Sequence, residues 1–457
     1  MSSPKDFEFY TPSPNIMRSS SAPPTDSFLS SRVNQSGIFR LFEEEPISHP
    51  QVRNLVDMIQ EDFPRTPSPV HGIFKGRKDE PISRCASEEP ATTTTSQTQL
   101  KLGRNINKYK LEDLKGQISR ISRDQFGSRY LQSKFTSGNK SDINMIFKEI
   151  EPDAYDLFDD SFSNYVAQQL FVHCTTEQRT KLFSRMIGHV MDLSMKSYAC
   201  RVLQCALSYI TEEQQVALIS EMKGNVLKLA SDRNANHVLQ VILECVPSKH
   251  LDFIYTDLAS EVVKVCCCAF SCRICQRALE FGTPQQIQPL IDQLVTNVHI
   301  LSKDKFGNYV IQALLAGKNN LKVQSNIFKR MKGHIFDLSI HKFSSNCVEK
   351  LISHCDEKDR VELIEELLQP LPQDKVDQFT RLNITSNKRA SKWIEDWRDG
   401  IDAIVLISCS QYGNYISQRI FDVVKGTQRM RMIDILRRYV GLLENMNFGR
   451  HILGRLQ

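Results

Sequence analysis

The chain has 457 residues and a formal net charge of +5. The basic excess lies after residue 100: residues 1–100 carry 10 Lys and Arg against 13 Asp and Glu, whereas the remainder carries 48 against 40. A moderately basic folded region suits a polyanionic partner, although many solvated surfaces are also basic. No stretch of about 18 apolar residues occurs, which argues against a membrane-spanning helix and a membrane partner.

The cysteines point to a reducing compartment. Twelve of the 13 lie after residue 100 at irregular spacing, and the first residues, MSSPKDFEFY, lack the apolar segment of a secretory signal. Such thiols do not form a disulfide framework, so the sequence predicts a cytoplasmic protein.

The first 100 residues have the composition of a disordered tail. They hold 12 of the 18 prolines, together with SSSAPPTDS at 19–27 and ATTTTSQTQ at 91–99. Such segments bury too little apolar surface to offset chain entropy, so we expect a regulatory tail over 1–100. Short Ser-Pro and Thr-Pro dipeptides and one Arg-Ser-Ser-Ser segment mark phosphorylation candidates, although motifs this short also arise by chance. The candidates are Ser13, Ser21, Thr66 and Ser68.

A seven-residue block recurs from residue 126 onward. Its first six copies, which end 36 residues apart, are FGSRYLQ (126–132), FSNYVAQ (162–168), YACRVLQ (198–204), NANHVLQ (234–240), FSCRICQ (270–276) and FGNYVIQ (306–312). FSSNCVE (343–349) ends 37 residues later, and YGNYISQ (412–418) ends 69 residues after that. A fixed period of this length is typical of a stacked repeat protein.

A glycine precedes several blocks. Gly116, Gly188, Gly224 and Gly333 each lie 16 residues before the last residue of their block. We therefore expect each unit to contain a helix after the glycine, a turn, and a second helix that carries the block. One such pair cannot bury its apolar face alone, so the sequence predicts an all-α superhelical solenoid. An opening cap is expected at 101–115, and a degenerate closing repeat at 447–457, where Gly454 replaces the expected Gln or Glu.

Three positions in the last five residues of each block carry the chemistry. We number these residues 1 to 5; positions 1 and 5 share one helix face, and position 2 lies beside them. Position 1 holds Ser128, Asn164, Cys200, Asn236, Cys272, Asn308, Ser345 and Asn414. Position 2 holds Arg129, Tyr165, Arg201, His237, Arg273, Tyr309, Asn346 and Tyr415. Position 5 holds Gln132, Gln168, Gln204, Gln240, Gln276, Gln312, Glu349 and Gln418.

These residue types match the requirements of base recognition. Asn and Gln amides offer a donor and an acceptor to a base edge, whereas the acceptor-only Glu349 suits the two donors of guanine. Most position 2 side chains are flat or delocalised and can stack on bases. The alternative is a protein-binding scaffold in which the glutamines form a hydrogen-bond ladder between repeats. A ladder explains the constant Gln, but it does not explain the paired change at Ser345 and Glu349.

The series SRYLQ, NYVAQ, CRVLQ, NHVLQ, CRICQ, NYVIQ, SNCVE and NYISQ resembles the eight-repeat Pumilio (PUF) family over about residues 105–457. The resemblance implies a PUF domain over 101–457: a right-handed superhelical solenoid of eight repeats, with single-stranded RNA on its concave face and antiparallel to the chain. In that family Asn with Gln reads uracil, Ser or Cys with Gln reads adenine, and Ser with Glu reads guanine. The implied element is 5′-UGUAUAUA-3′ in messenger RNA 3′ untranslated regions. Translational repression through recruited co-repressors or deadenylases, on the convex face or an insertion, is implied as well.

The main departure from the period lies between the seventh and eighth blocks. The surplus of 33 residues falls near 371–400, which includes Trp393 and Trp397 at i and i+4. Paired aromatics usually belong to a core. A protein-docking insertion is the second interpretation.

The sequence predicts neither a metal centre nor a cofactor nor an enzyme. CCCAFSCRIC (266–275) resembles a zinc motif, but a closed site needs four suitably placed ligands, and Cys272 already occupies position 1 of its block. The chain contains no P-loop, HExxH or GxSxG motif.

Overall fold

The computed structural model describes residues 103–317, 321–383, 394 and 400–456. All of them belong to one compact unit, Gly76–Gln457. The predicted tail over 1–100, its candidate phosphosites Ser13, Ser21, Thr66 and Ser68, and the tryptophans Trp393 and Trp397 lie outside the described residues.

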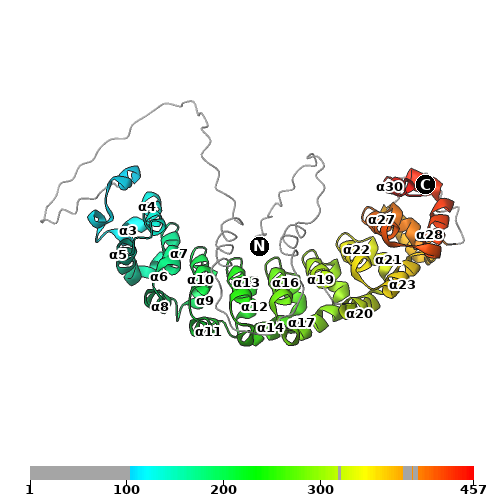
Figure 1. Cartoon of the computed structure of the whole chain (residues 1–457). Coiled ribbons are helices and arrows are strands. Elements are labelled where there is room, and N and C mark those ends of the chain that lie inside the picture. Colours follow the sequence, from blue (N-terminus) through cyan, green and yellow to red (C-terminus); the bar gives the residue numbers. More distant parts are fainter. Residues whose placement is uncertain (1–102, 318–320, 384–393, 395–399, 457) are drawn as a thin grey trace, which may run out of the picture. The chain divides into compact units, whose positions relative to one another are not determined.

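The expected all-α repeat solenoid is confirmed. Each repeat consists of three helices, which stack along a curved row (Figure 1). In the described ranges the only extended pairing is one isolated bridge, between Pro370 and Asp402. No helix in these ranges is long and apolar enough to cross a bilayer.

The first helix of each repeat is short and follows the positions marked by glycine. These helices are α3 (Ile118–Ser122), α6 (Ala154–Phe158), α9 (Val190–Met195), α12 (Val226–Ser231), α15 (Val262–Cys266), α18 (Val298–Lys303), α21 (Ile335–Ser339) and α26 (Ala403–Cys409). Gly116, Gly188, Gly224 and Gly333 all have φ between +75° and +86°, a region that strains any other residue. The backbone N–H groups of Gly188 and Val190 both donate to the Glu221 carboxylate, at 2.6 and 3.1 Å. The glycine therefore ends one repeat and aims the next short helix.

The second helix carries the block, and we call these eight the block helices. They are α4 (Gln125–Thr136), α7 (Ser163–His173), α10 (Ala199–Leu207), α13 (Ala235–Cys245), α16 (Ser271–Phe281), α19 (Gly307–Ala316), α22 (Ser344–His354) and α27 (Gly413–Val423). Each packs on the next from α4 to α27, and they follow the inner edge of the curve in Figure 1.

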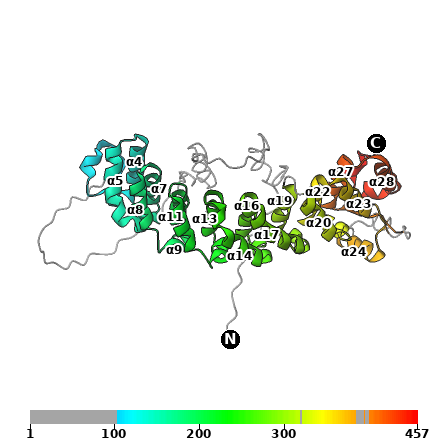
Figure 2. The same ribbon diagram turned by 60° about the horizontal axis from the view of Figure 1, so that its bottom comes forward.

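A third helix, absent from our sequence prediction, completes each repeat on the outer edge of the row (Figures 1 and 2). These helices are α5 (Lys140–Ile150), α8 (Thr176–Ser184), α11 (Glu212–Ser220), α14 (Asp252–Ser260), α17 (Pro284–Thr296), α20 (Leu321–Met331), α23 (Glu357–Leu367) and α28 (Gly426–Arg438). Three of them begin with a Thr-x-x-Gln capping box, led by Thr175, Thr211 and Thr283. In this box the threonine hydroxyl and the glutamine amide satisfy the free N–H groups of the first turn.

One apolar core runs through the stack. Its buried side chains extend without interruption from Ile106 to Leu456. Because neighbouring repeats share this core, no repeat folds as an isolated unit.

Degenerate elements close both ends of the stack, as expected. The 3-10 helices η2 (Gly103–Lys108) and η3 (Leu111–Leu114) precede the first repeat, and α29 (Val440–Asn445) and α30 (Arg450–Leu453) follow the eighth. Short 3-10 helices within the array are η4 (Glu151–Asp153) and η5 (Ser248–His250).

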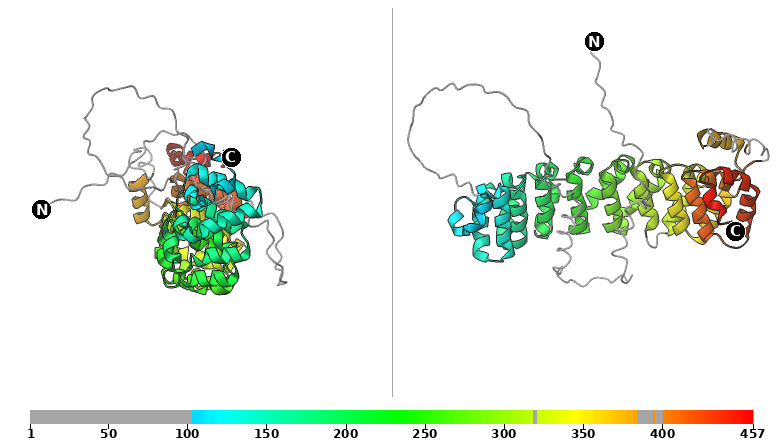
Figure 3. Two further views of the ribbon diagram at one scale, coloured as in Figure 1. Left: turned by 90° about the vertical axis from the view of Figure 1, so that its left-hand side faces the viewer. Right: turned by 90° about the horizontal axis from the view of Figure 1, so that it is seen from above.

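The surplus residues near 371–400 leave the array and return to it at one point. Leu371 N donates to Ile401 O at 2.9 Å, and Ala403 N donates to Gln369 O at 3.0 Å. We call this pairing the pinch. In the described part of the excursion, α24 (Gln373–Asn383) stands outside the row of block helices (gold in Figures 2 and 3), and its Phe379 packs on Phe336 of α21.

Because of the pinch, the eighth repeat stacks on the seventh as if nothing intervened. Gln428 of α28 donates to the Val361 carbonyl of α23 at 3.0 Å, and Arg431 donates to the Leu368 carbonyl at 3.1 Å. The block helices α22 and α27 are in direct contact.

Candidate nucleic-acid interface

The three predicted positions of each block fall on one side of the block helices, but at different depths. Every position 1 side chain is buried, with exposed fractions between 0 and 6%. Position 5 side chains are half-buried, except that Gln204 and Gln312 are 6% exposed. Position 2 side chains reach furthest into solvent. The expectation that all three point equally at a ligand is therefore refined: position 1 lies beneath position 5.

In the four Asn-containing repeats, position 1 orients position 5. The Nε2 atoms of Gln168, Gln240, Gln312 and Gln418 each donate to Oδ1 of the Asn one turn earlier, at 2.8 to 3.1 Å. That Asn is anchored in turn, because its Nδ2 donates to a backbone carbonyl at the start of its own helix. The Gln amide keeps one N–H and its oxygen for a ligand.

Repeats with Ser or Cys at position 1 hold the Gln differently. Gln132 Nε2 donates to the Ser128 hydroxyl at 3.0 Å, and that hydroxyl donates to the Phe162 carbonyl of the next repeat at 2.7 Å. Gln276 Nε2 donates to the backbone carbonyl of Cys272 at 3.3 Å, not to its side chain. The residue at position 1 therefore changes what fixes the amide above it.

The Cys residues at position 1 are neutral thiols at physiological pH. Burial raises the pKa of Cys200 and of Cys272 to about 11. Their sulfur atoms contact backbone carbonyls of the preceding turn, Ser197 O at 3.6 Å and Ala269 O at 3.5 Å.

Position 2 offers a row of exposed flat groups. Tyr165, Tyr309 and Tyr415 are 44, 37 and 62% exposed, which is unusual for aromatic side chains in a helical array. Arg129, His237, Arg273 and Asn346 are exposed as well, and Arg201 is half-buried. An unburied aromatic on each of three block helices matches the stacking platforms of single-strand nucleic-acid binders.

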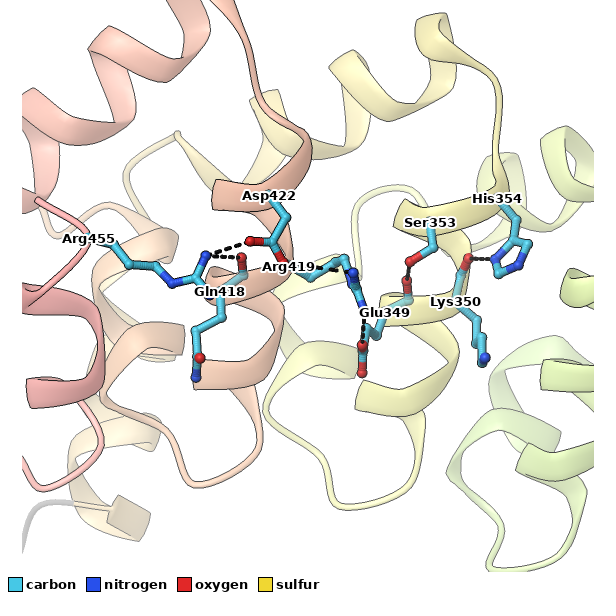
Figure 4. A network of polar contacts seen from close by, with 8 residues as sticks. All are labelled: Glu349, Lys350, Ser353, His354, Gln418, Arg419, Asp422 and Arg455. Atoms are coloured by element: carbon cyan, nitrogen blue, oxygen red, sulfur yellow. Dashed lines mark hydrogen bonds and ion pairs between the residues drawn. The ribbon is translucent and has the colours of Figure 1, made fainter. Parts of the chain in front are cut away.

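Glu349, the single acidic residue at position 5, has an unexpected partner. Arg419 of the eighth repeat reaches back to it, with 3.0 Å between Nη2 and Oε1 (Figure 4). Sequence reasoning missed this arginine, although it directly follows the position 5 residue Gln418 and could have been found by extending the repeat alignment by one residue.

The cysteine-rich segment 266–275 serves the fold. Cys266 and Cys275 are both fully buried, with 3.7 Å between their sulfur atoms, and link the short helix to the block helix of one repeat. Among the described residues, no group of three or more His, Cys, Asp or Glu side chains is arranged to hold a metal ion.

A family model described as "Pumilio-family RNA binding repeat" matches eight segments of the chain. They are residues 117–151, 160–187, 189–223, 225–259, 261–295, 297–316, 334–368 and 403–437. Each matched segment begins at the short helix of one repeat, and the gap before 403 coincides with the excursion closed by the pinch.

Two curated relatives show the extent of the similarity. The chain is 27% identical over 350 residues to "Putative pumilio homolog 8, chloroplastic" from Arabidopsis thaliana, covering 76% of this chain and 61% of that protein. It is 32% identical over 282 residues to "Suppressor protein MPT5" from Saccharomyces cerevisiae, covering 59% and 32%. The chain thus spans about half the length of several curated relatives, such as 53% and 48% of two further Arabidopsis proteins.

Solved structures similar to this chain contain RNA. The PUF-8 complex with PBE-RNA aligns with a TM-score of 0.66 at 26% identity, over 79% of this chain and 97% of that one. The Puf3 RNA binding domain bound to a Cox17 RNA 3′ UTR recognition sequence aligns with a TM-score of 0.63 at 29% identity, over 78% and 99%.

Proposed function

The chain belongs to the Pumilio family of RNA-binding repeat proteins, and from this premise we propose that it binds single-stranded messenger RNA 3′ untranslated regions in a sequence-specific manner. The observation that carries the proposal is the variation at position 1 beneath a nearly constant Gln. Asn, Ser and Cys alternate there, and the one Glu at position 5 coincides with one of the two Ser. A purely structural ladder would have no need of such variation.

The proposed element is 5′-UGUAUAUA-3′, read from the eighth repeat to the first. Asn414 with Gln418 reads the first U, Ser345 with Glu349 the G, and Asn308 with Gln312 the next U. The remaining repeats then read A, U, A, U and A through Cys272, Asn236, Cys200, Asn164 and Ser128. The hydrogen bonds from Gln to Asn support the assignment, because they leave a donor and an acceptor side by side, as the edge of uracil requires.

We further propose that binding represses translation or promotes decay of the bound message in the cytoplasm. The chain would act as a binding module that recruits co-repressors or the deadenylase machinery, not as an enzyme. The outer edge of the solenoid, built from the third helices, and the excursion near 371–400 remain free when RNA lies along the block helices. They are the surfaces we assign to protein partners.

A binding assay with the full chain tests the RNA proposal. We expect tight binding to a UGUAUAUA oligonucleotide and strongly reduced binding when UGU is replaced by ACA. The scaffold alternative predicts weak binding to both oligonucleotides, with the same affinity and the same steep salt dependence.

A further inference from the structure

Arg419 lies where the eighth repeat meets the seventh. It directly follows Gln418 on α27, and its guanidinium crosses to α22, where Nη2 lies 3.0 Å from Oε1 of Glu349 (Figure 4). Both side chains are partly exposed, at 39 and 35%. The contact joins the proposed guanine-reading carboxylate to a residue 70 positions away in sequence.

Arg419 is itself held in place from the closing cap. Its Nη1 lies 3.8 Å from Oδ2 of Asp422 one turn later, and Oδ1 of Asp422 accepts a 2.5 Å hydrogen bond from Arg455. Arg455 also donates to the Gln418 carbonyl at 3.4 Å. Figure 4 shows Arg455, Asp422, Arg419 and Glu349 as one alternating series of charges.

No other repeat has this arrangement in the described part of the chain. The residues that follow position 5 are Ser133, Gln169, Cys205, Val241, Arg277, Ala313, Lys350 and Arg419. Arg277 is the other arginine, but the position 5 residue one repeat earlier is the neutral Gln240, and Arg277 pairs with Glu280 on its own helix at 3.0 Å. An arginine and an acidic reader thus face each other at one repeat junction.

The contact leaves Glu349 able to bind a base. A carboxylate has two oxygens with about four acceptor sites, and Arg419 occupies one of them. Guanine presents N1–H and N2–H₂ as two parallel donors, which the remaining sites can accept. A Glu side chain held in one orientation before binding loses less conformational freedom when the base arrives.

We propose that Arg419 is a positioning residue for guanine selectivity: it fixes the Glu349 carboxylate so that the seventh repeat discriminates G from other bases. This inference rests on the proposed RNA-binding function. Arg419 acts through Glu349 and is not expected to touch the base.

The test compares base preference, not affinity alone. Full-length wild type and Arg419→Met are titrated with UGUAUAUA and with the same oligonucleotide carrying A at the second base. We expect the preference for G over A to fall by about two- to tenfold in Arg419→Met, the cost of ordering one flexible side chain. Preference for U over A at the third base should stay unchanged. Arg419→Lys, which keeps a cationic donor, should recover part of the loss.

Arg277→Met is the matched control, since it removes the equivalent arginine where the neighbouring reader is neutral. It should leave discrimination at the second base intact. Unchanged G preference in both Arg419→Met and Arg419→Lys overturns the inference. So does equal weakening of all oligonucleotides with a shallower salt dependence, because that result indicates a phosphate contact.

The outcomes separate the inference from its premise. If wild type shows no G preference, the proposed function fails and the inference fails with it. If wild type prefers G and the variants do so to the same extent, the inference alone fails. Stoichiometric titration gives the active fraction of each preparation. If Arg419→Met does not fold, Arg419→Lys decides alone.

Discussion

Gln312 donates a 2.8 Å hydrogen bond from Nε2 to Oδ1 of Asn308, one turn earlier on α19. Asn308 is held from below, because its Nδ2 donates to the Asp304 carbonyl at 2.8 Å. The two amides therefore form one unit whose direction is fixed by the start of the helix. This makes position 1 the element that sets selectivity, although it is the more deeply buried of the two.

Replacing Asn308 by Ser should move the preference at the third base from U to A. The substitution removes the acceptor that orients Gln312 and recreates the Ser–Gln pair of the first repeat. We expect a change in relative affinity of about 1–3 kcal/mol, the usual worth of one base-edge contact. Competition binding with oligonucleotides varied at the third base measures it. Asn236→Ser is the control and should alter the fifth base only; retained U preference at the third base in Asn308→Ser contradicts the assignment.

The double variant Ser345→Asn with Glu349→Gln should convert the second base from G to U, because it installs the Asn–Gln pair in the seventh repeat. The Glu349→Gln change also removes the carboxylate that Arg419 contacts. We therefore expect a cleaner switch when Arg419→Gln is added, measured as the ratio of affinities for U and G. If the double variant still prefers G, the register of the eight repeats is wrong.

Tyr309→Ala should weaken binding to all matching and mismatching sequences alike. Its ring is 37% exposed at position 2, where it can stack on a base but reads no edge. Loss of one stacking platform costs about 1–3 kcal/mol. Tyr309→Phe keeps the ring and should bind as wild type does, so isothermal titration of both variants tells stacking apart from hydrogen bonding by the hydroxyl. A loss confined to one sequence would speak against stacking.

Gly333→Ala should destabilise the fold, whereas Gly454→Ala should not. Gly333 has φ +84°, and an L-residue in that region costs about 1–2 kcal/mol. Gly454 has φ −63°, and a Cβ built there meets no atom within 4 Å. Thermal unfolding followed by circular dichroism compares the two. Equal melting temperatures for both variants would show that the left-handed conformation at Gly333 carries no strain.

The thiols of Cys200 and Cys272 should not influence RNA affinity between about pH 6 and 8. Burial raises the pKa of each to about 11, so both stay protonated across that range. Because the folded state raises these pKa values above the ordinary 9.0, the stability linked to them is complete below pH 9 and falls as the pH rises through about 11. Affinity measured against pH, with alkylation of native and unfolded protein as the comparison, checks this. Rapid alkylation of the native protein would contradict it.

The sequence alone was sufficient to predict the repeat number and the location of the block helices. The 36-residue spacing places every position 5 residue one repeat from the next, and stacking preserves that spacing in three dimensions. The left-handed glycines were marked for the same reason, since a conformation that excludes side chains leaves a visible trace at a fixed interval.

Other features could not be read from the spacing. The third helices escaped because their apolar faces are interrupted by polar residues, and the Thr-x-x-Gln capping boxes at Thr175, Thr211 and Thr283 were not recognised. The different depths of positions 1 and 5 depend on how neighbouring helices pack. The pairing of Arg419 with Glu349 spans 70 residues and requires the eighth repeat to dock on the seventh despite the 33 surplus residues.

The pinch between residues 369–371 and 401–403 has a consequence for how this protein can change. Two backbone hydrogen bonds, Leu371 to Ile401 and Ala403 to Gln369, close the excursion at its base. Length and composition can therefore vary beyond that base without shifting the pitch at which bases are read. Such a site tolerates exchange as a cassette: one lineage, or one engineer, can replace what lies between these bonds and alter the company the protein keeps while its target sequence stays the same.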